Sequence, residues 1–425
     1  MAGRRVVITG IGAVTSLGNT WQETWRGVLA GDSGAGPITQ FDAETWPTTF
    51  ACEVKDFVLT DEAVLAPHRC FLNRPTEFGM AAALQAVRES GIEGTVAPER
   101  LGVSIGAGIG AISPHGLSDM LQGMELDAGL RDLCREVEKT AATQIVLKNH
   151  PGVLAAVLGA RWKALGPLTT IHTACASSGQ SLGQAYMQIK RGEADAIIAG
   201  GADSLAGELL LAGFCLLGAL SRRNEDPKAG SRPFDKERDG FVAGEGAAML
   251  ILEERGRAEK RGARIYGEIV GYGETESAYR ITDLPPNGRG IVEAMHMAVA
   301  ESGLDFGDIG YINAHGTSTE LNDRVEALAI RRVFGSRGHR PMISSTKSEV
   351  GHLISAAGAL EMMFSTLAVY EGRVPPTRNL LHTDCGDDLD FVTLKMREVP
   401  IRAALSNSIG FGGSNSSLIV AKEPL

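Results

Sequence analysis

Short runs of β-branched and other apolar residues recur along the chain and alternate with stretches of helical periodicity. The first run, Arg5 to Thr9, ends at Gly10 and predicts a buried strand. Further runs predict strands at 102–106, 194–199, 247–252, 265–271, 309–313, 341–345, 390–395, 403–408 and 417–421. Helical patterns at 76–90 and 179–191 end at glycines, which are typical of helix C-caps. Strands that alternate with helices predict an α/β fold.

A charged stretch, Arg255 to Gly262, separates two predicted strands near the middle of the chain. The 425 residues are many for one hydrophobic core, so two packed units are expected. The segments on either side show the same coarse order of strands and helices, which fits an ancient duplication. We therefore predict one half at residues 1–255 and a second half at residues 256–425.

Residues 113–160 are the hardest part of the chain to interpret. The stretch 121–148 is rich in charge and has leucines at helical spacing. A helical insertion on the surface is the favoured interpretation. A cap over the substrate entrance, or part of a subunit interface, is the alternative.

Gly10-Ile11-Gly12 follows the first strand and resembles the start of a dinucleotide-binding loop. Thr15 stands where that fingerprint has its third glycine, and Asp32 lies in a predicted turn instead of at a strand end. A strand-to-loop turn in a parallel sheet is therefore favoured over a cofactor site.

Composition and charge exclude several classes of protein. A formal net charge of −10 argues against nucleic-acid binding, which requires a basic face. The apolar run at the amino terminus is too short for a signal peptide, and no segment approaches membrane-spanning length. The six cysteines form no CxxC pair, so a disulfide framework or zinc site is not expected. We expect a protein of the reducing cytosol.

Cys175 is the candidate nucleophile. It lies among small residues between an extended segment, Leu168 to His172, and a predicted helix. The partial positive charge at a helix amino terminus favours the thiolate and lowers the cysteine pKa. The backbone amide of Cys175 can also face a developing oxyanion. A Cys/His pair alone would equally suit a cysteine protease or a thioesterase.

Two histidines follow predicted strands, where open α/β sheets bind ligands. His315 begins the segment HGTST, whose hydroxyls can bind the amides of an extended ligand. His352 ends the segment KSEVGH, which begins with Lys347. A third segment, GFGGSN, is rich in glycine and places Phe411 between glycines. It is either a strand-ending turn with a buried aromatic residue or a gate, in which Phe411 blocks a tunnel and its amide is a second oxyanion donor.

The ordered set of Cys175, HGTST, KSEVGH and GFGGSN resembles the β-ketoacyl-acyl-carrier-protein synthases, the elongating condensing enzymes of fatty-acid and type II polyketide synthesis. The opening residues RVVITGIG and the segment RPFDKERDGF with Gly244-Glu245-Gly246 are similar as well. The resemblance therefore covers nearly the whole chain.

The resemblance implies a thiolase-type fold, with two similar α/β halves stacked in five layers (αβαβα). It implies that Cys175 accepts the acyl group and that His315 and His352 support decarboxylation of a malonyl thioester. Lys347 would hold the histidines with Glu326 as its partner. The amides of Cys175 and Phe411 would form the oxyanion hole. Residues assigned to substrate by the same resemblance are Thr317 and Thr319 for the pantetheine arm, and Ile109 with Phe411 for the acyl pocket.

The implied partner is an acyl carrier protein whose phosphopantetheine arm brings the substrate, with no metal and no tightly bound cofactor. A homodimer is expected, and a heterodimer with a chain-length-factor-like subunit is the alternative. The basic residues Arg69, Arg74, Arg222, Arg223 and Lys228 are candidates for docking the carrier, although solvated surface charges explain them equally well.

The chain departs from the family pattern at a few positions: Glu320 replaces proline, Ile409 replaces phenylalanine, Ser355 replaces glycine, and Ser277 to Arg280 replace Asp-Ala-Tyr-His. These departures leave the chemistry standing and leave the pathway and acyl chain length open. Two rival functions remain: a non-condensing chain-length-factor-like subunit, which typically lacks the cysteine, and a cysteine-dependent thioester hydrolase.

Overall fold

The computed structural model describes residues 3–59, 68–108, 147–335 and 338–422. Within these residues, eleven strands form one hydrogen-bonded sheet in the order β12-β10-β9-β14-β15-β8-β1-β7-β6-β4-β5. Their bounds are β1 (Val6–Val14), β4 (Leu101–Ala107), β5 (Leu168–Ile171), β6 (Ala196–Ser204), β7 (Glu245–Glu254), β8 (Gly267–Glu276), β9 (Ile309–Asn313), β10 (Met342–Ser344), β12 (Asp390–Phe391), β14 (Ala403–Ile409) and β15 (Ser414–Ala421). Two small sheets pair β2 (Gly36–Pro37) with β3 (Phe50–Ala51), and β11 (Arg373–Val374) with β13 (Arg397–Glu398).

The large sheet consists of two half-sheets that repeat one topology. In the first half, β1, β4, β5, β6 and β7 stand in the spatial order third, second, fourth, fifth, first. In the second half, β8, β9, β10, β14 and β15 stand in the same order, with β12 added at the edge. In both halves the second strand is parallel to the third and fourth, and the fifth is antiparallel to its neighbours. The prediction of two similar α/β halves is confirmed, and β1 joins them by pairing with β8.

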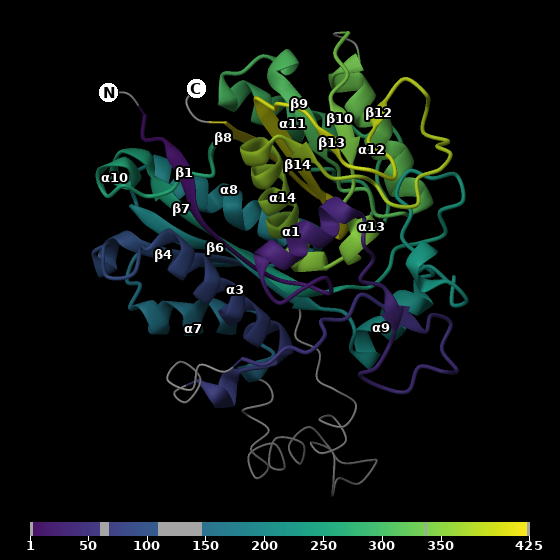
Figure 1. Cartoon of the computed structure of the whole chain (residues 1–425), viewed down its shortest axis with the longest axis horizontal. Coiled ribbons are helices and arrows are strands. Elements are labelled where there is room, and N and C mark those ends of the chain that lie inside the picture. Colours follow the sequence, from purple (N-terminus) through teal and green to yellow (C-terminus); the bar gives the residue numbers. More distant parts are fainter. Residues whose placement is uncertain (1–2, 60–67, 109–146, 336–337, 423–425) are drawn as a thin grey trace, which may run out of the picture.

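Helices form three layers around the two half-sheets (Figure 1). The helices α3 (Arg74–Ser90) and α7 (Val153–Trp162) cover the outer face of the first half-sheet. The outer face of the second half-sheet packs against α11 (Arg289–Ser302) and α12 (Glu320–Val333). Between the half-sheets lie α8 (Ser177–Lys190) and α14 (Ala357–Glu371). The predicted five layers are therefore present.

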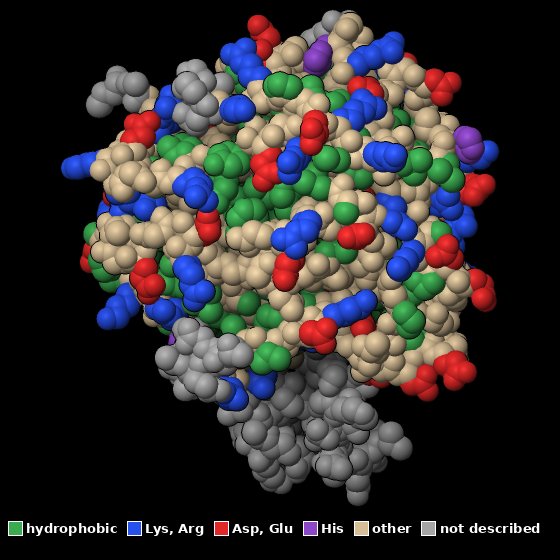
Figure 2. All heavy atoms as spheres, viewed as in Figure 1, with side chains coloured by type: hydrophobic (Ala, Val, Ile, Leu, Met, Phe, Trp, Pro, Cys, Tyr) green, Lys and Arg blue, Asp and Glu red, His purple; other side chains and the backbone are tan. Residues whose placement is uncertain are grey.

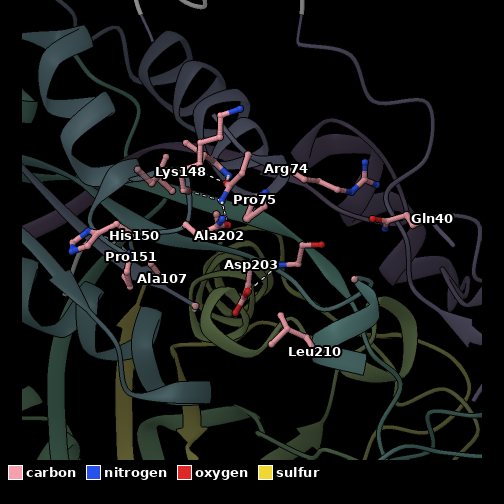
Figure 3. Close-up of a pocket in the computed structure, with 17 residues that line it drawn as sticks. Gln40, Arg74, Pro75, Ala107, Lys148, His150, Pro151, Ala202, Asp203 and Leu210 are labelled. Carbon is pink, nitrogen blue, oxygen red and sulfur yellow. Dashed lines mark hydrogen bonds between the residues drawn. The ribbon is translucent and has the colours of Figure 1, made fainter. Parts of the chain in front are cut away.

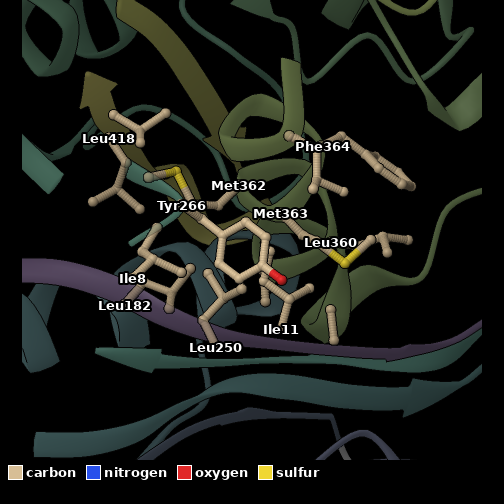
Figure 4. Close-up of a cluster of buried hydrophobic side chains, with 14 of the residues drawn as sticks. Ile8, Ile11, Leu182, Leu250, Tyr266, Leu360, Met362, Met363, Phe364 and Leu418 are labelled. Atoms are coloured by element: carbon tan, nitrogen blue, oxygen red, sulfur yellow. The ribbon is translucent and has the colours of Figure 1, made fainter. Parts of the chain in front are cut away.

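The central layer holds the largest hydrophobic cluster (Figure 4). Leu182 of α8 and Met362 of α14 meet Ile8 and Leu250 from the strands of the first half-sheet. Because it is covered on both sides, α14 is buried continuously from Ala357 to Val369. A helix in this position is expected to be apolar all round.

The glycines of the apparent dinucleotide-binding loop serve helix packing. They lie inside β1, which continues to Val14 and pairs antiparallel with both of its neighbours. A Cβ atom at Gly12 would come within 1.9 Å of the carbonyl oxygen of Ala82, and one at Gly10 within 2.2 Å of that of Ala86. Glycine thus lets α3 lie directly on the strand. The interpretation of this segment as a strand-to-loop turn in a parallel sheet is therefore wrong.

Each half carries a 3-10 turn that leads directly into its central helix. The turn η3 (Ala174–Ala176) precedes α8, and the turn η7 (Ile354–Ala356) precedes α14. The first residue of each turn has a positive φ, 48° in η3 and 40° in η7. Cys175 and Ser355, the middle residues of the turns, therefore occupy equivalent places in the two halves.

Lysine and arginine side chains mix with aspartate and glutamate over the face shown in Figure 2, without a broad region of one sign. Within the described ranges, no helix combines the length and the apolar character that crossing a membrane requires. Of the cysteines in those ranges, Cys52, Cys70, Cys175, Cys215 and Cys385 are free thiols. The helical insertion predicted at 121–148 falls almost wholly outside the described residues, and the division of the chain at 255 and 256 stays a prediction.

Candidate active site

Cys175 lies in the connection between the last residues of β5 and the central helix α8. The chain leaves β5 at Ile171, turns through η3 and enters α8 at Ser177. The hydroxyl of Ser177 donates to the carbonyl of Ala174 (2.6 Å) and accepts from the amide of Thr173 (2.9 Å), which fixes the turn. The predicted position of Cys175 before a helix is confirmed, and its side chain is buried.

His352 comes from the second half and lies against the thiol. It follows the short helix α13 (Lys347–Val350), and its Nε2 atom is 3.1 Å from Sγ of Cys175. The amide of Ile354 donates to its Nδ1 atom over 3.3 Å. Because Nδ1 accepts this hydrogen bond, the neutral ring carries its proton on Nε2 and presents it to the cleft.

His315 is the second imidazole and follows β9. Its ring centroid lies 5.3 Å from that of His352, and the two rings are nearly perpendicular. The ammonium of Lys347 lies 3.2 Å from Nδ1 of His315 and donates to its carbonyl oxygen over 2.6 Å. An ammonium group only donates, so Nδ1 is an acceptor here and Nε2 carries the proton. Both histidines therefore offer an N–H donor beside the thiol.

The acidic partner of Lys347 is Glu361. The two side chains form a buried ion pair between α13 and α14. Glu326 instead accepts hydrogen bonds from the amides of His315 and Gly316, each over 2.8 Å. The expectation that Glu326 pairs with Lys347 is therefore wrong. Glu361 could have been found from the sequence as the one acid within the apolar stretch Ala356 to Phe364.

The segment HGTST is held by carboxylates of α12. Besides Glu326, Asp323 accepts from the amide of Thr317 over 2.9 Å. The hydroxyl groups of Thr317 and Thr319 lie 2.8 Å apart, and both residues line the same cleft as Cys175. The position predicted for the pantetheine arm is thus beside the thiol.

Phe411 covers the thiol from the remaining side. Its backbone N–H faces the thiol of Cys175, and its side chain is 38% exposed in the wall of the cleft. The next two residues, Gly412 and Gly413, have φ values of 89° and 100°, which favour glycine. The turn thus points the backbone N–H of Phe411 toward the thiol and places its side chain in the wall of the cleft.

Burial decides the protonation states of the site. It lowers the pKa of His315 and of His352 well below the usual value, and the charge of Lys347 acts in the same direction. Both rings are therefore neutral at pH 7. Burial raises the pKa of the Cys175 thiol to about 12, although Lys347 and the Phe411 amide oppose this effect. The expected lowering of the cysteine pKa is therefore wrong, and the resting group is a thiol.

The cleft that joins these residues has a volume of about 90 Å³ and is open to solvent. Ile281, Leu284, Leu321 and Ile409 give it apolar walls. Sγ of Cys175 and the ring nitrogens of His315 and His352 lie within 4.8 Å of one another, a spacing that could hold a metal ion. The ammonium of Lys347 beside His315 disfavours a cation there, and the absence of a metal remains our prediction.

Other candidates from the sequence lie elsewhere. Ile109 is outside the described residues. Arg74 forms an ion pair with buried Glu245 and also binds the carbonyl of Val54, so its guanidinium is engaged within the chain. Arg222 and Lys228 are exposed.

Comparison with known proteins agrees with this arrangement. Residues 3–258 match the profile of the β-ketoacyl synthase N-terminal domain, and residues 266–381 match that of the C-terminal domain. The chain is 41% identical to the 3-oxoacyl-[acyl-carrier-protein] synthase 2 of Coxiella burnetii, with 99% of each chain covered. It is also 41% identical to that of Synechocystis, over 99% of this chain and 98% of the relative.

Solved structures similar to the chain include a β-ketoacyl synthase from Burkholderia phymatum, with a TM-score of 0.87, 32% identity and coverage of 99% and 100%. The ishigamide ketosynthase/chain length factor has a TM-score of 0.85 and 34% identity over 100% of both chains. A type II polyketide ketosynthase bound to its acyl-carrier protein and a hexaketide has a TM-score of 0.85 and 30% identity, over 99% of this chain and 100% of that one. The fold is therefore the thiolase-type fold of ketosynthases.

Proposed function

Because the chain belongs to the β-ketoacyl synthase family, we propose that it extends acyl thioesters by decarboxylating Claisen condensation, with Cys175 as nucleophile. The observation that carries the proposal is the 3.1 Å contact between Sγ of Cys175 and Nε2 of His352, beside a second neutral histidine held by Lys347. This constellation supplies a nucleophile and two N–H donors in one buried cleft.

In the first half-reaction, Sγ of Cys175 attacks the carbonyl of an acyl group on the phosphopantetheine thiol of a carrier protein. The new S–C bond replaces the old one, and the thiol proton leaves with the carrier's sulfur, so no net proton is consumed. The amides of Cys175 and Phe411 bind the oxyanion of the tetrahedral intermediate. The charge of Lys347 and the Phe411 amide favour the transient thiolate.

In the second half-reaction, a malonyl thioester enters the same cleft with its arm against Thr317 and Thr319. The bond to its carboxylate breaks and releases carbon dioxide, and the electron pair forms an enolate. The Nε2–H groups of His315 and His352 donate to the thioester oxygen as negative charge develops there. Neutral rings suit this task, since each keeps its proton on Nε2 throughout.

The enolate carbon then attacks the acyl group on Cys175. The oxyanion again forms between the amides of Cys175 and Phe411, and its collapse expels the cysteine sulfur. The product is a β-ketoacyl thioester two carbons longer, and one proton taken up from water restores the thiol of Cys175. No step requires a metal or a nicotinamide.

The partner in this proposal is an acyl carrier protein, and a homodimer is the proposed assembly, with a heterodimer of ketosynthase and chain-length-factor-like subunits as its alternative. We propose the cytosol as its compartment, because the chemistry needs Cys175 as a free thiol. The acyl chain belongs to fatty-acid synthesis or to a specialised polyketide or polyene pathway. The relatives named 3-oxoacyl-[acyl-carrier-protein] synthase 2 support the first, and the similar structure of a type II polyketide ketosynthase supports the second.

The test incubates the protein with an acyl-carrier-protein thioester, reads the intact mass, then adds malonyl-carrier protein. We expect one acyl group on the native protein, a β-ketoacyl product after the second addition, and neither event with Cys175→Ala. Cys215→Ala, which removes a free thiol outside the cleft lining, is the matched control and should behave as the native protein.

Two outcomes would contradict the proposal. Acylation followed by release of free acid would indicate a thioester hydrolase. An unmodified Cys175 across acyl chain lengths, with the same result after addition of a chain-length-factor subunit, would indicate a non-condensing member of the family.

A further inference from the structure

A buried carboxylate outside the catalytic cleft lies behind the turn that follows His352. Asp203 is near the end of β6, and its side chain is 5% exposed. It lies in the wall of a second cavity, beside Ala202 and Leu210 (Figure 3). A Cβ atom at Gly108 would come within 2.4 Å of the carboxylate oxygens, so the backbone of the neighbouring chain segment confines the group.

The carboxylate holds two backbone amides. One oxygen accepts from the amide of Ser204 over 2.9 Å, on its own strand. The other accepts from the amide of Ser355 over 3.0 Å, on η7 of the second half. The second bond ties the end of a strand in one half to the 3-10 turn of the other half.

The turn that receives this bond is strained. Ile354 has a φ of 40°, a region that β-branched residues rarely adopt and that persists only where surrounding contacts impose it. The amide of Ser355 belongs to the peptide bond that follows this residue. Asp203 therefore restrains the carboxyl side of Ile354, and the packing of β6 against η7 completes the restraint.

The amino side of the same residue contacts the catalytic ring. The amide of Ile354 is the donor to Nδ1 of His352 over 3.3 Å. A loss of the left-handed conformation would rotate this N–H away from the ring. The ring would then no longer be confined to the form that carries its proton on Nε2, toward Cys175.

We propose that Asp203 is a positioning residue for His352, which fixes the strained turn at Ile354 so that the histidine presents its Nε2–H to the substrate oxygen. The inference rests on the proposed function of His352 as a donor during decarboxylation. It predicts that removal of the carboxylate affects the second half-reaction far more than the acylation of Cys175.

The experiment compares Asp203→Ala, Asp203→Asn and the exposed control Asp387→Ala with the native protein. Acylation is read by intact mass, and condensation by steady-state kinetics with malonyl-carrier protein. For Asp203→Ala we expect kcat of condensation to fall about 10- to 100-fold, with KM and acylation near native values. This is the size of effect found when a residue that orients a metal-binding histidine is lost. Asp203→Asn keeps an oxygen that accepts from Ser355 and should recover most of kcat.

A second readout observes the ring itself. Nitrogen NMR of histidine-labelled protein should show an unprotonated Nδ1 for His352 in the native protein and in Asp203→Asn, and mixed tautomers in Asp203→Ala. If Asp203→Ala does not fold, Ile354→Gly added to it removes the strain, and this pair is compared with Ile354→Gly alone.

Equal losses in Asp203→Ala and Asp203→Asn, or parallel losses of acylation and condensation, would overturn the proposal. A change in KM that depends on the acyl chain would instead make Asp203 a contact of the acyl group. The native protein in the same assay keeps the two proposals apart, because the proposed function fails only if the native protein does not condense.

Discussion

The ammonium of Lys347 lies 3.2 Å from Nδ1 of His315, close enough to keep that nitrogen an acceptor. The proton of His315 is therefore on Nε2, on the side of Cys175. His352 reaches the same state by a different donor, the backbone amide of Ile354. Two unrelated contacts thus give the cleft a matched pair of neutral N–H donors.

Replacement of Lys347 by methionine should release the orientation of His315. We expect kcat of condensation to fall about 100-fold, the range seen when one oxyanion donor is lost. Acylation of Cys175 should fall less, because the amides of Cys175 and Phe411 remain. Rapid-quench measurement of each half-reaction checks this, with the exposed Lys395→Met as control. An equal loss in both half-reactions would show that Lys347 acts mainly on the thiol.

The ion pair between Lys347 and Glu361 should show in stability. Lys347→Met leaves Glu361 buried without its partner, and we expect a cost of about 3–5 kcal/mol in the free energy of unfolding. The double variant Lys347→Met/Glu361→Gln should recover a large part of it. Urea unfolding of the two single variants and the double variant completes the cycle, and additive effects would contradict a coupled pair.

Glu361 should contribute to the pH dependence of the free energy of unfolding. Burial raises the pKa of Glu361 from 4.5 to about 7, against the opposing effect of Lys347. The folded state then binds more protons than the unfolded state, so this group makes the free energy of unfolding fall as the pH rises between 4.5 and about 7. Glu361→Gln should flatten that part of the stability profile. An unchanged slope would mean that Glu361 is ionised throughout.

Alkylation of Cys175 should report a thiol and not an ion pair with His352. Since burial raises the thiol pKa to about 12, its rate with iodoacetamide should rise about tenfold per pH unit from pH 6 to 9, in proportion to the thiolate fraction. Peptide mapping separates this signal from exposed Cys70. A plateau at low pH would reveal a thiolate–imidazolium pair instead.

Gly12→Ala should weaken the fold without any effect on nucleotide binding. The added Cβ meets the backbone of α3 at 1.9 Å, and such overpacking costs about 1–3 kcal/mol. Gly213→Ala, in α9 (Glu208–Leu216), has nothing within 4 Å of the new atom and should be neutral or slightly stabilising. Thermal unfolding compares the two variants, and equal melting temperatures would contradict the packing role.

Apolar patterning predicted most of the strands, because the buried strands of both half-sheets contain short runs of apolar residues. It located β1, β4, β6, β7, β8, β9, β10, β14 and β15 with errors of up to five residues at their ends. At 390–395 only Asp390–Phe391 is a strand. Lateral pairing, which determines the order of strands, leaves no trace in local periodicity, so the repeated topology could only be suspected.

The candidate catalytic residues could be predicted because their motifs are local in the sequence, whereas their partners could not. Glu361 lies fourteen positions from Lys347, on another helix, and Asp203 is 152 positions from Ser355. The family resemblance implies Glu326 as the ion-pair partner of Lys347, whereas its carboxylate binds the backbone amides of His315 and Gly316. The effect of burial on the pKa of the Cys175 thiol could not be predicted either, because the sequence shows where the helix begins but not how deeply the thiol is buried.

Cys175 and Ser355 occupy equivalent turns, but the two halves contribute different groups to the cleft. Both halves build the same left-handed turn before the same central helix, yet only one turn bears a reactive atom. The equivalent turn at Ser355 carries no nucleophile. It is bound to the first half through Asp203 and supports His352 through the amide of Ile354. The two turns differ at their middle residue, Cys175 in one and Ser355 in the other, and the histidine donors come only from the second half. The cleft therefore needs both halves: two copies of the first half would give two nucleophiles without donors, and two copies of the second would give two sets of donors without a nucleophile.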